Sequence, residues 1–581
     1  MKAIAFLMLF TAMAFTGTIT PELSEMMEET DAGNLIRVLI KPIGMVDVEY
    51  VMNATRGMDR AQTREFAAEV MKDRAASSQA GILEQIASLP TGSVEDVHPF
   101  WIVNAIALSM TPEAIAEISD RDDILYIRFM RRSDILIEPV DEYTQERAPK
   151  ANAWGVDKIG APDVWAMGYY GSGIVVSVVD TGVNYNHVDL HNQMWHDTPA
   201  GYHYGWDFDD NDGDPMDTYG HGTHCAGSVA SNGNAGTTCG VAPSATIMAL
   251  RVGVTFSDEQ DVWDAFQFSI DYGADVISTS LGWPQSQNPD RFTWRETENN
   301  VLAAGICHSI AAGNEAGNPG TPGDIRTPGD VPPPWLHPDQ TTIGGLSAVV
   351  TVGATDSNDN IASFSSRGYS TWMYESPWFD YSDVSPYIGL IDPDISGPGV
   401  DITSCSNTNN TGYTTMSGTS MATPHLAGCM ALVLEANPAL SPAQVDSVLE
   451  VTALDLGDTG KDNVFGAGRV QIYEAVLAAL NVGVDGSTGS TPESGLILSV
   501  AGSNPSFGSL MFDLYTGVSA DMDISVFDIT GRKVAIIQNG SVSQGNHSFT
   551  WSVPGNIGNG IYFLRASSNQ GSVSERFTLL R

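Results

Sequence analysis

Short apolar runs alternate with helical patterns between residues 153 and 481. Five of the runs are apolar on both faces: GIVVSVVD, ATIMALRV, ADVISTSLG, GICHSIAAGN and AVVTVGATD. A strand with one face in water alternates apolar and polar positions, whereas strands like these are typical of a parallel sheet covered by helices on each side. The pattern therefore predicts an α/β domain, with a parallel sheet flanked by helices, over residues 153–481.

A smaller α+β unit is predicted over residues 34–139. Its elements are an apolar strand, a long helix with charged residues on one face, a second strand, a helix that Thr111 and Pro112 open, and a third strand. The polar stretch after this unit predicts a linker at residues 140–152.

The two ends of the chain have other patterns. Residues 1–18 place one lysine before an apolar run and then small residues, which is typical of a signal peptide; a buried helix is the alternative. Residues 482–495 are rich in Gly, Ser and Thr and predict a linker. Residues 496–581 contain alternating strands and turns, which predict a C-terminal β-sandwich. No later segment has the run of apolar residues that a membrane-spanning helix needs.

Charge and cysteine content narrow the classes of function. The chain has 70 acidic and 27 basic residues, a formal net charge of −43. Such a surface repels nucleic acids and anionic membranes, so neither is an expected partner. Five cysteines allow at most two disulfides, so this is not a disulfide scaffold. Cys307 and Cys429 lie in apolar patterns and are expected in the core.

Four polar residues stand where strands end or helices begin. Asp180 ends the strand GIVVSVVD, His221 opens a helix after Gly220, Ser420 opens an apolar helix, and Asn314 follows the strand GICHSIAAG. In an open α/β sheet such positions meet at the carboxyl edge of the strands. Hydrolysis of a peptide bond by a hydroxyl needs a nucleophile, a base, a carboxylate that orients the base and a donor for the oxyanion.

The local sequences around these residues resemble a known family. VVDTGV, HGTHCAG, AAGNE and GTSMATPH are similar to the four signature segments of the subtilisin-like serine proteases, or subtilases. The resemblance covers residues 153–481. It implies that Asp180 orients the base, His221 is the general base and acid, Ser420 is the nucleophile and Asn314 binds the oxyanion, in the chain order known for subtilisin.

The same resemblance implies the substrate-binding walls. They would pair with an extended substrate strand and enclose the side chain before the cut; the residues are Ser280, Leu281, Gly282, Ala311, Ala312 and Gly313. The chain departs from the family in two long loops at residues 321–345 and 369–389, which we expect to alter the rim of the cleft. The expected function is a secreted serine endopeptidase that cuts polypeptides. An esterase with the same residues and a non-catalytic adhesion protein are the alternatives.

Cys225 lies one helical turn after His221. A buried small residue beneath the histidine is the expected role; a second nucleophile is the alternative. His221, His224 and Cys225 also suggest a zinc site, but third and fourth ligands are not evident.

An acidic loop precedes His221 and suggests a structural metal. Asp207, Asp210, Asp212 and Asp214 fall within one short segment, and like charges that close favour a hard cation such as calcium. The segment is similar to a calcium loop of some subtilases; a solvated acidic turn is the alternative. Asp189 matches a second calcium ligand of the family. No organic cofactor is expected.

Two further resemblances concern export. Residues 34–139 resemble subtilase propeptides, which implies a chaperone and inhibitor that is removed by a cut within 140–152. The C-terminal part, with ITGRKV, GNGIYFL and FTLLR, resembles sorting domains of the type IX secretion system, so the secretion machinery is an expected partner. A surface- or polysaccharide-binding module is the alternative. The mature protein would be extracellular, either released or held on the cell surface.

Overall fold

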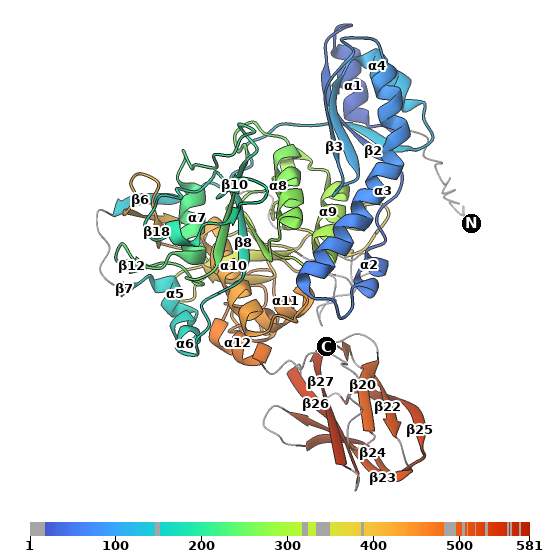
Figure 1. Ribbon diagram of the computed structural model, residues 1–581, viewed down its shortest axis with the longest axis vertical. Coiled ribbons are helices and arrows are strands. Elements are labelled where there is room, and N and C mark those ends of the chain that lie inside the picture. The colour runs from blue at the N-terminus through green and yellow to red at the C-terminus, as the bar shows by residue number, and fades with distance from the viewer. Residues whose placement is uncertain are drawn as a thin grey trace, which may run out of the picture.

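The computed structural model places three units along the chain (Figure 1). It describes residues 18–145, 151–316, 324–332, 349–384, 388–480, 496–501, 506–507, 509–516, 519–528, 533–554, 557, 560–568 and 571–580. The predicted signal peptide and the linker at 482–495 lie outside these residues, apart from residue 18. Among the described residues, no helix is both long and apolar enough to cross a membrane.

The central unit is built on a seven-stranded sheet in which every neighbouring pair is parallel. This sheet confirms the predicted α/β architecture. Strands with two apolar faces need a covering layer on each side of the sheet. In spatial order the strands are β11 (Gly205–Asp207), β13 (Thr246–Arg251), β8 (Val175–Asp180), β14 (Val276–Thr279), β15 (Cys307–Ala311), β16 (Val350–Thr355) and β17 (Ile395–Pro398).

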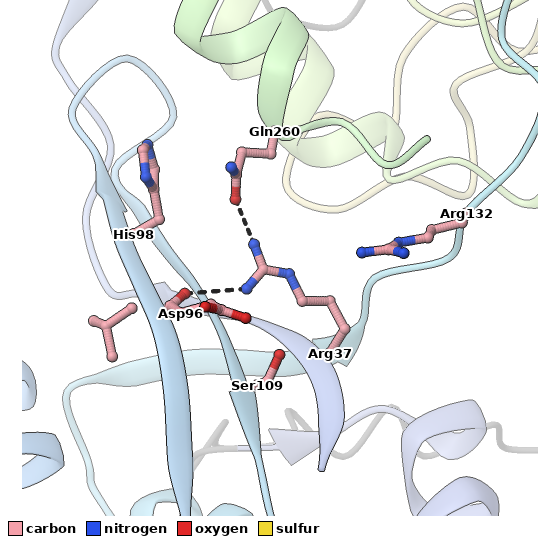
Figure 2. Close-up of a pocket in the computed structure, with 7 residues that line it drawn as sticks. Arg37, Asp96, His98, Ser109, Arg132 and Gln260 are labelled. Atoms are coloured by element: carbon pink, nitrogen blue, oxygen red, sulfur yellow. Dashed lines mark hydrogen bonds between the residues drawn. The ribbon is translucent and has the colours of Figure 1, made fainter. Parts of the chain in front are cut away.

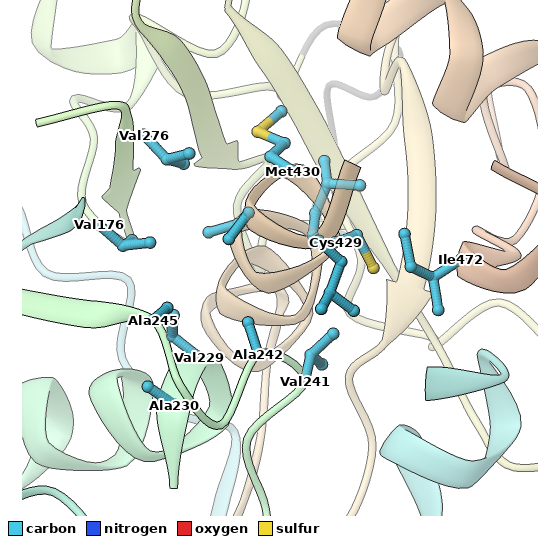
Figure 3. Close-up of a cluster of buried hydrophobic side chains, with 14 of the residues drawn as sticks. Val176, Val229, Ala230, Val241, Ala242, Ala245, Val276, Cys429, Met430 and Ile472 are labelled. Carbon is cyan, nitrogen blue, oxygen red and sulfur yellow. The ribbon is translucent and has the colours of Figure 1, made fainter. Parts of the chain in front are cut away.

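Alternate residues of each strand enter two different cores. In β8, Val176 and Val178 pack in one hydrophobic cluster and Val179 in the other. The first cluster surrounds α10 (Thr419–Ala436), where Val176, Val276 and Met430 meet from strands and helix (Figure 3). The helices of the central unit that contribute to the first cluster are α5 (Trp154–Lys158), α6 (Ala161–Ala166), α7 (His221–Ala230), α10, α11 (Pro442–Val451) and α12 (Ile472–Leu480). Those that contribute to the second are α8 (Gln260–Asp271) and α9 (Arg291–Ala303), together with helices of the N-terminal unit.

The N-terminal unit has a five-stranded sheet covered by helices, as its pattern predicts. The strand order is β1 (Thr18–Ile19), β5 (Ile124–Phe129), β2 (Ile36–Pro42), β4 (Ala105–Met110) and β3 (Val94–Phe100). The helices are α1 (Pro21–Glu29), α2 (Val48–Ala54), α3 (Arg60–Ser88) and α4 (Pro112–Ser119). The sequence pattern did not reveal β1, α1 or β3. β3 exposes most of its side chains, so it carries no apolar signal.

The N-terminal unit packs on α8 and α9, and α3 runs along both helices (Figure 1). Basic residues of the unit meet acidic residues of the central unit. Buried Lys41 pairs with Glu296, and Arg128 pairs with Glu259 at 2.8 Å and with Asp290 at 2.7 Å. Further such pairs among the described residues are Arg37–Asp258, Arg132–Asp258, Arg60–Asp275, Arg64–Asp275 and Lys72–Asp271. Opposite charges across a contact favour one partner and one orientation.

A polar pocket lies on this seam, between the N-terminal sheet and α8 (Figure 2). The Arg37 guanidinium crosses it, donating to the Asp96 carbonyl oxygen at 3.1 Å and to the Gln260 side chain. His98 contacts Asp264 at 3.0 Å nearby. The pocket is therefore part of the contact between the two units.

The predicted linker at 140–152 begins as a strand. β6 (Asp141–Gln145) adds to an antiparallel sheet beside β19 (Tyr413–Ser417), which also pairs with β18 (Ile402–Cys405). Val140 N–H donates to the Ser417 carbonyl at 2.7 Å just before β6. The polar composition concealed this strand because its pairing depends on an edge supplied from far along the chain. Short strands also pair at β9 (His196–Asp197) with β10 (Tyr202–His203) and at β7 (Ala151–Asn152) with β12 (Thr237–Thr238).

The C-terminal unit consists of two sheets around its own core, as the alternating pattern predicts. One sheet contains β20 (Leu496–Ala501), β22 (Ser509–Thr516) and β25 (Gly545–Ser552). The other contains β21 (Ser506–Phe507), β27 (Gly571–Leu580), β26 (Gly560–Ser568), β23 (Ala520–Asp528) and β24 (Lys533–Val542). Apart from the parallel β21–β27 pair, the strands are antiparallel. Phe512, Leu564 and Phe577 are among its buried side chains.

The aromatic loop at residues 369–389 is anchored by a buried ion pair. Asp380 accepts two hydrogen bonds of 2.7 Å from Arg295 of α9, and both side chains are fully buried. The Arg295 guanidinium also lies against the rings of Trp372 and Trp378, at 4.8 and 4.5 Å from their centroids. Removing one partner of such a pair leaves the other charge buried and uncompensated.

We predict that Asp380→Ala lowers the free energy of unfolding by about 3–5 kcal/mol, because buried Arg295 would lose the carboxylate that accepts two of its hydrogen bonds. Lys158→Ala is the matched control. Lys158 pairs with Asp359 at 2.9 Å while its side chain is 26% exposed, so the loss should be at most about 1 kcal/mol. Denaturant unfolding in a Ser420→Ala background, which prevents self-digestion, measures both. Equal losses would contradict the anchoring role of the pair.

Candidate active site

Asp180 and His221 form a buried hydrogen-bonded pair. Asp180 is the last residue of β8, and its Oδ1 accepts from His221 Nδ1 at 2.8 Å and from Thr181 N–H at 2.8 Å. His221 is the first residue of α7, which begins after Gly220 at a φ of 116°. Gly222 N–H donates to Thr181 Oγ1 at 2.9 Å, which ties the start of the helix to the end of the strand. The sequence prediction that these two residues meet agrees with this geometry.

Asp217 organises the loop that delivers His221, and the sequence analysis missed it. Its carboxylate accepts from the N–H groups of Tyr219, Gly220 and Thr223 at 2.7–2.9 Å. The Thr181 and Thr223 hydroxyls donate to it at 3.0 and 2.6 Å. Asp217 lies three residues before Gly220, the N-cap of α7, so the rule for capping residues does not identify it from the sequence. Burial raises the pKa of Asp217, and these hydrogen bonds oppose that effect.

Ser420 and Asn314 meet at the start of α10, where Asn314 bonds to Thr419, the residue before Ser420. Ser420 is the second residue of α10, and its carbonyl oxygen accepts from Ser280 Oγ at 3.0 Å. Asn314 Oδ1 accepts from both the N–H and the hydroxyl of Thr419, each at 3.0 Å. These two bonds fix the side-chain amide, so its Nδ2 is the end left to donate elsewhere.

Residues 135–140, called the cleft segment below, run through the site in extended form. Ile135 accepts from Gly282 N–H at 2.9 Å, and Ile137 N–H approaches the Ser280 carbonyl at 3.4 Å. An antiparallel bridge joins the residues between them, Leu136 and Leu281. The predicted wall at 280–282 thus pairs with a strand of this same chain, in the manner predicted for a substrate.

The cleft segment also engages the candidate nucleophile and the candidate oxyanion donor. Ser420 Oγ donates to the Ile137 carbonyl at 2.8 Å, and Asn314 Nδ2 donates to the Glu138 carbonyl at 2.8 Å. His221 Nε2 has no hydrogen-bond partner among the described residues. The serine hydroxyl is therefore bonded to the segment instead of to the imidazole. Two consecutive carbonyl groups share the contacts that a single reacting carbonyl would make.

Among the described residues, Arg326 contacts the second predicted wall, residues 311–313. Ala312 accepts from Arg326 N–H at 3.0 Å, and Gly313 N–H donates to Thr419 Oγ1 at 3.2 Å. Of the loop predicted at 321–345, the structure describes residues 324–332, and the described chain resumes at residue 349. Arg326, which lies in that loop, carried no sequence signal for a role in the site.

The electrostatics of the pair suit a base that accepts a proton. Burial lowers the pKa of His221, but the negative charge of Asp180 and the hydrogen bond to it outweigh burial, so the pKa is raised well above its ordinary value. The nearby His224 lacks such a partner, and burial lowers its pKa to about 3. Proximity of a carboxylate thus distinguishes the two histidines of α7.

Cys225 packs beneath the imidazole as a buried thiol. Its Sγ lies 3.8 Å from His221 Nδ1 and 3.5 Å from the Ser420 carbonyl oxygen. Burial raises its pKa, which disfavours the thiolate that a nucleophile needs. Asp180, His221 and Cys225 bring ligand atoms within 4.8 Å of one another, whereas His224 Nε2 contacts the Ile402 carbonyl instead. All five cysteines of the chain are buried and free.

The acidic loop before His221 already holds a cation from the chain itself. The Arg251 guanidinium contacts Asp207, reaches Asp210 at 2.6 Å and reaches Asp209 at 2.8 Å. Asp207 is buried, and burial raises its pKa while Arg251 opposes that effect. The sequence argument treated these carboxylates as unpaired; that premise is wrong, because Arg251 comes from the end of β13 and is far away in the sequence.

The remaining predicted ligands have protein partners too. Asp212 Oδ1 accepts from Asp214 N–H at 2.9 Å, and Asp214 Oδ1 accepts from the Tyr185 hydroxyl at 2.8 Å. Buried Asp189 accepts from Ala235 N–H at 2.6 Å, and also from the Ser231 and Tyr413 hydroxyls at 3.0 and 2.8 Å. Both oxygens of Asp189 are therefore bonded to protein donors, and its carboxylate also lies within 4.8 Å of ligand atoms of His187 and Cys405.

Comparison with known proteins identifies two regions. The subtilase family model matches residues 171–468, about half of the chain, and the model of the secretion system C-terminal sorting domain matches residues 504–579. Thermitase of Thermoactinomyces vulgaris is 33% identical over 58% of this chain and 99% of its own length. Subtilisin E of Bacillus subtilis is 28% identical over 65% of this chain and 81% of its own length.

Bacillopeptidase F of Bacillus subtilis is 29% identical over 72% of this chain, but the match spans only 29% of that longer protein. The sorting domain and the subtilisin relatives indicate a secreted protein. The length of the family match, together with the positions of Asp180, His221 and Ser420 at the carboxyl edge of the sheet, leads to one conclusion. The chain belongs to the subtilase family of serine proteases and ends in a sorting domain of the type IX secretion system.

Proposed function

We propose that this protein is a secreted serine endopeptidase that hydrolyses peptide bonds through an acyl-enzyme and is made as a self-processing zymogen. The observation that carries the proposal is the cleft segment. One extended strand contacts both Ser420 Oγ and Asn314 Nδ2, beside the Asp180–His221 pair. An adhesion protein has no need of this arrangement, and an esterase has no need of a wall that pairs with a peptide backbone.

In the proposed mechanism His221 Nε2 takes the proton of Ser420 as its oxygen attacks the carbonyl carbon. Asp180 holds the imidazole through Nδ1 and stabilises the positive charge that forms. Asn314 Nδ2 and the Ser420 backbone N–H bind the oxyanion. The start of α10 adds the positive end of its helix dipole. His221 then returns the proton to the leaving amine, and water releases the acyl group by the same steps.

We propose that residues 34–139 act as chaperone and inhibitor of the protease unit. Their basic residues face acidic residues of α8 and α9, and the cleft segment blocks the substrate position. The sequence prediction put the maturation cut within 140–152. Since the residues in the cleft are 135–140, we propose the Ile137–Glu138 bond for the first cut. Ile137 is the residue whose N–H faces the Ser280 carbonyl and whose carbonyl faces Ser420.

We predict that Ser420→Ala stops maturation, because the nucleophile for the first cut is removed. The variant should accumulate as a precursor that still contains the N-terminal unit, and the parent should yield a chain beginning at Glu138. Mass spectrometry of the secreted products and N-terminal sequencing measure both. Adding parent enzyme to the purified variant is the control for an intact cut site. A variant processed normally when expressed alone would show that another protease makes the cut.

We predict that peptide hydrolysis rises with pH through the raised pKa of His221, because only the neutral imidazole can accept the serine proton. Asp180→Asn removes the charge that raises this pKa, so burial should bring the pKa below the ordinary value of about 6.5. The kcat should fall about 10⁴-fold, as for the equivalent change in other triads. An NMR titration of His221 in the Ser420→Ala protein measures the pKa. An unchanged pKa in Asp180→Asn would contradict the proposed role of Asp180.

We further propose a structural calcium ion at the acidic loop. The carboxylates of Asp207, Asp210, Asp212 and Asp214 are oxygen ligands of the type that calcium prefers. They lie within one short segment, residues 207–214, so all four could bind a single ion. Arg251 holds part of this set, so calcium would have to compete with it. The ion would stabilise the loop that leads to His221 and would take no part in the chemistry.

We predict that calcium raises the melting temperature, because an ion that binds only the folded state adds about 2.7 kcal/mol at a hundredfold excess over Kd. Asp212→Asn should reduce the effect of both calcium and EDTA. Asp209→Asn is the matched control: Asp209 contacts Arg251 but is outside the proposed ligand set, so its calcium response should persist. Differential scanning calorimetry measures the change. A melting temperature indifferent to calcium and EDTA in the parent protein would exclude the site.

A further inference from the structure

Arg326 lies between the two walls that enclose the side chain before the cut. A Cβ atom built on Gly282 of the first wall would be 3.0 Å from Arg326 Cβ, and one built on Gly313 of the second wall would be 3.3 Å from Arg326 Cγ. Arg326 N–H also donates to Ala312 at 3.0 Å, which fixes its backbone against the second wall. The aliphatic part of this arginine therefore fills space between walls that two glycines keep narrow.

The charge of Arg326 is compensated inside the same pocket. Its Nε and Nη2 donate to Glu315 Oε1 at 2.9 and 2.6 Å, and Nη1 donates to the Gly282 carbonyl at 3.0 Å. Ser366 Oγ donates to the other Glu315 oxygen at 3.1 Å. The side chains of Arg326 and Glu315 are 13% and 25% exposed, so water screens this ion pair little.

The cleft segment reaches this pocket as a substrate would. Arg326 Nη1 lies 3.3 Å from the Leu136 carbonyl and 3.5 Å from the Ile135 carbonyl. Side chains alternate along an extended strand, so Leu136 and Ile137 face opposite sides. Ile137, the residue before the proposed first cut, is fully buried beside Ser420. A β-branched aliphatic residue thus occupies the position in the native precursor.

We infer that the Arg326–Glu315 pair forms the floor of this pocket and restricts cleavage to bonds after short aliphatic residues such as Ile and Val. The Arg326 stem leaves too little depth for an aromatic ring. Acidic and basic side chains are both rejected, because each would have to break a pair whose charges already satisfy one another and would be left partly desolvated. This inference rests on the proposed protease function.

The inference predicts a different preference for each way of breaking the pair. Arg326→Gly should open the floor and admit aromatic residues. Arg326→Gln removes the guanidinium, which frees the space beside Glu315 and takes away its counter-charge, so this variant should favour Lys and Arg. Glu315→Gln leaves Arg326 unpaired, which should favour Asp and Glu. Specificity is the difference between the affinities for two substrates. Each change should therefore alter which side chain the pocket prefers, and not only weaken binding.

The test is hydrolysis by the mature enzyme of fluorogenic peptides Ser-Asp-Ile-Leu-X, which copy residues 133–136 and vary X among Ile, Phe, Lys and Glu. The parent should prefer Ile over each other residue by about tenfold or more in kcat/KM. We expect the ratio to Ile to rise about tenfold for Phe in Arg326→Gly, for Lys in Arg326→Gln and for Glu in Glu315→Gln. Lys158→Ala, remote from the pocket, should keep the parent ranking.

Active-site titration with a fluorophosphonate separates the possible failures. Variants that label and hydrolyse peptides with the parent ranking would overturn the role of the Arg326–Glu315 pair, as would a parent that prefers Phe, Lys or Glu. If Arg326→Gly does not fold, the two changes to Gln still decide the question. A parent enzyme that neither labels nor cuts any peptide would instead contradict the proposed protease function.

Discussion

The site depends on a carboxylate buried at the end of a parallel strand. Asp180 closes β8, where both faces of the sheet are covered, and an unpaired charge there would be strongly unfavourable. Its hydrogen bond to His221 supplies the partner and also raises the pKa of the imidazole. Asp217 then holds the loop before α7 with five donors, so the helix start cannot move away from the strand end. The end of the strand and the position of the base therefore depend on the same set of contacts.

The N-terminal unit adds a second constraint, because it brings a strand of the chain into the cleft. The unit packs on α8 and α9 through pairs of opposite charge, and residues 135–140 continue from it across Ser420 to β6. With Ser420 Oγ bonded to the segment, His221 Nε2 lacks its serine partner. In our account the precursor is inactive for this reason, and loss of the segment restores the Ser420–His221 contact. The acidic side chains on the central unit thus pair with basic side chains of the chain's own N-terminal unit.

Local sequence patterns were sufficient to predict the strands and helix starts whose signals lie within a few residues. The apolar strands around Asp180 and Asn314 and the helix starts at His221 and Ser420 carry their signals within a few residues, and the parallel sheet brings these ends together. Features that join distant segments carried no such signal. Arg251 in the acidic loop, β6 on the edge of β19 and Arg326 between the pocket walls each depend on residues far away in the chain. Asp217 gave no signal either, because it lies outside the N-cap position of α7.

The most direct test of the account is the reaction of Ser420 with a fluorophosphonate before and after removal of the N-terminal unit. A precursor with the Ile137–Glu138 bond made uncleavable should label slowly, because the cleft segment occupies the serine hydroxyl, and the mature chain should label at Ser420 in full. Mass spectrometry of the modified peptide identifies the residue. Absence of labelling in a folded mature chain would contradict the catalytic site. Equal rates in precursor and mature chain would contradict the blocking role of residues 135–140.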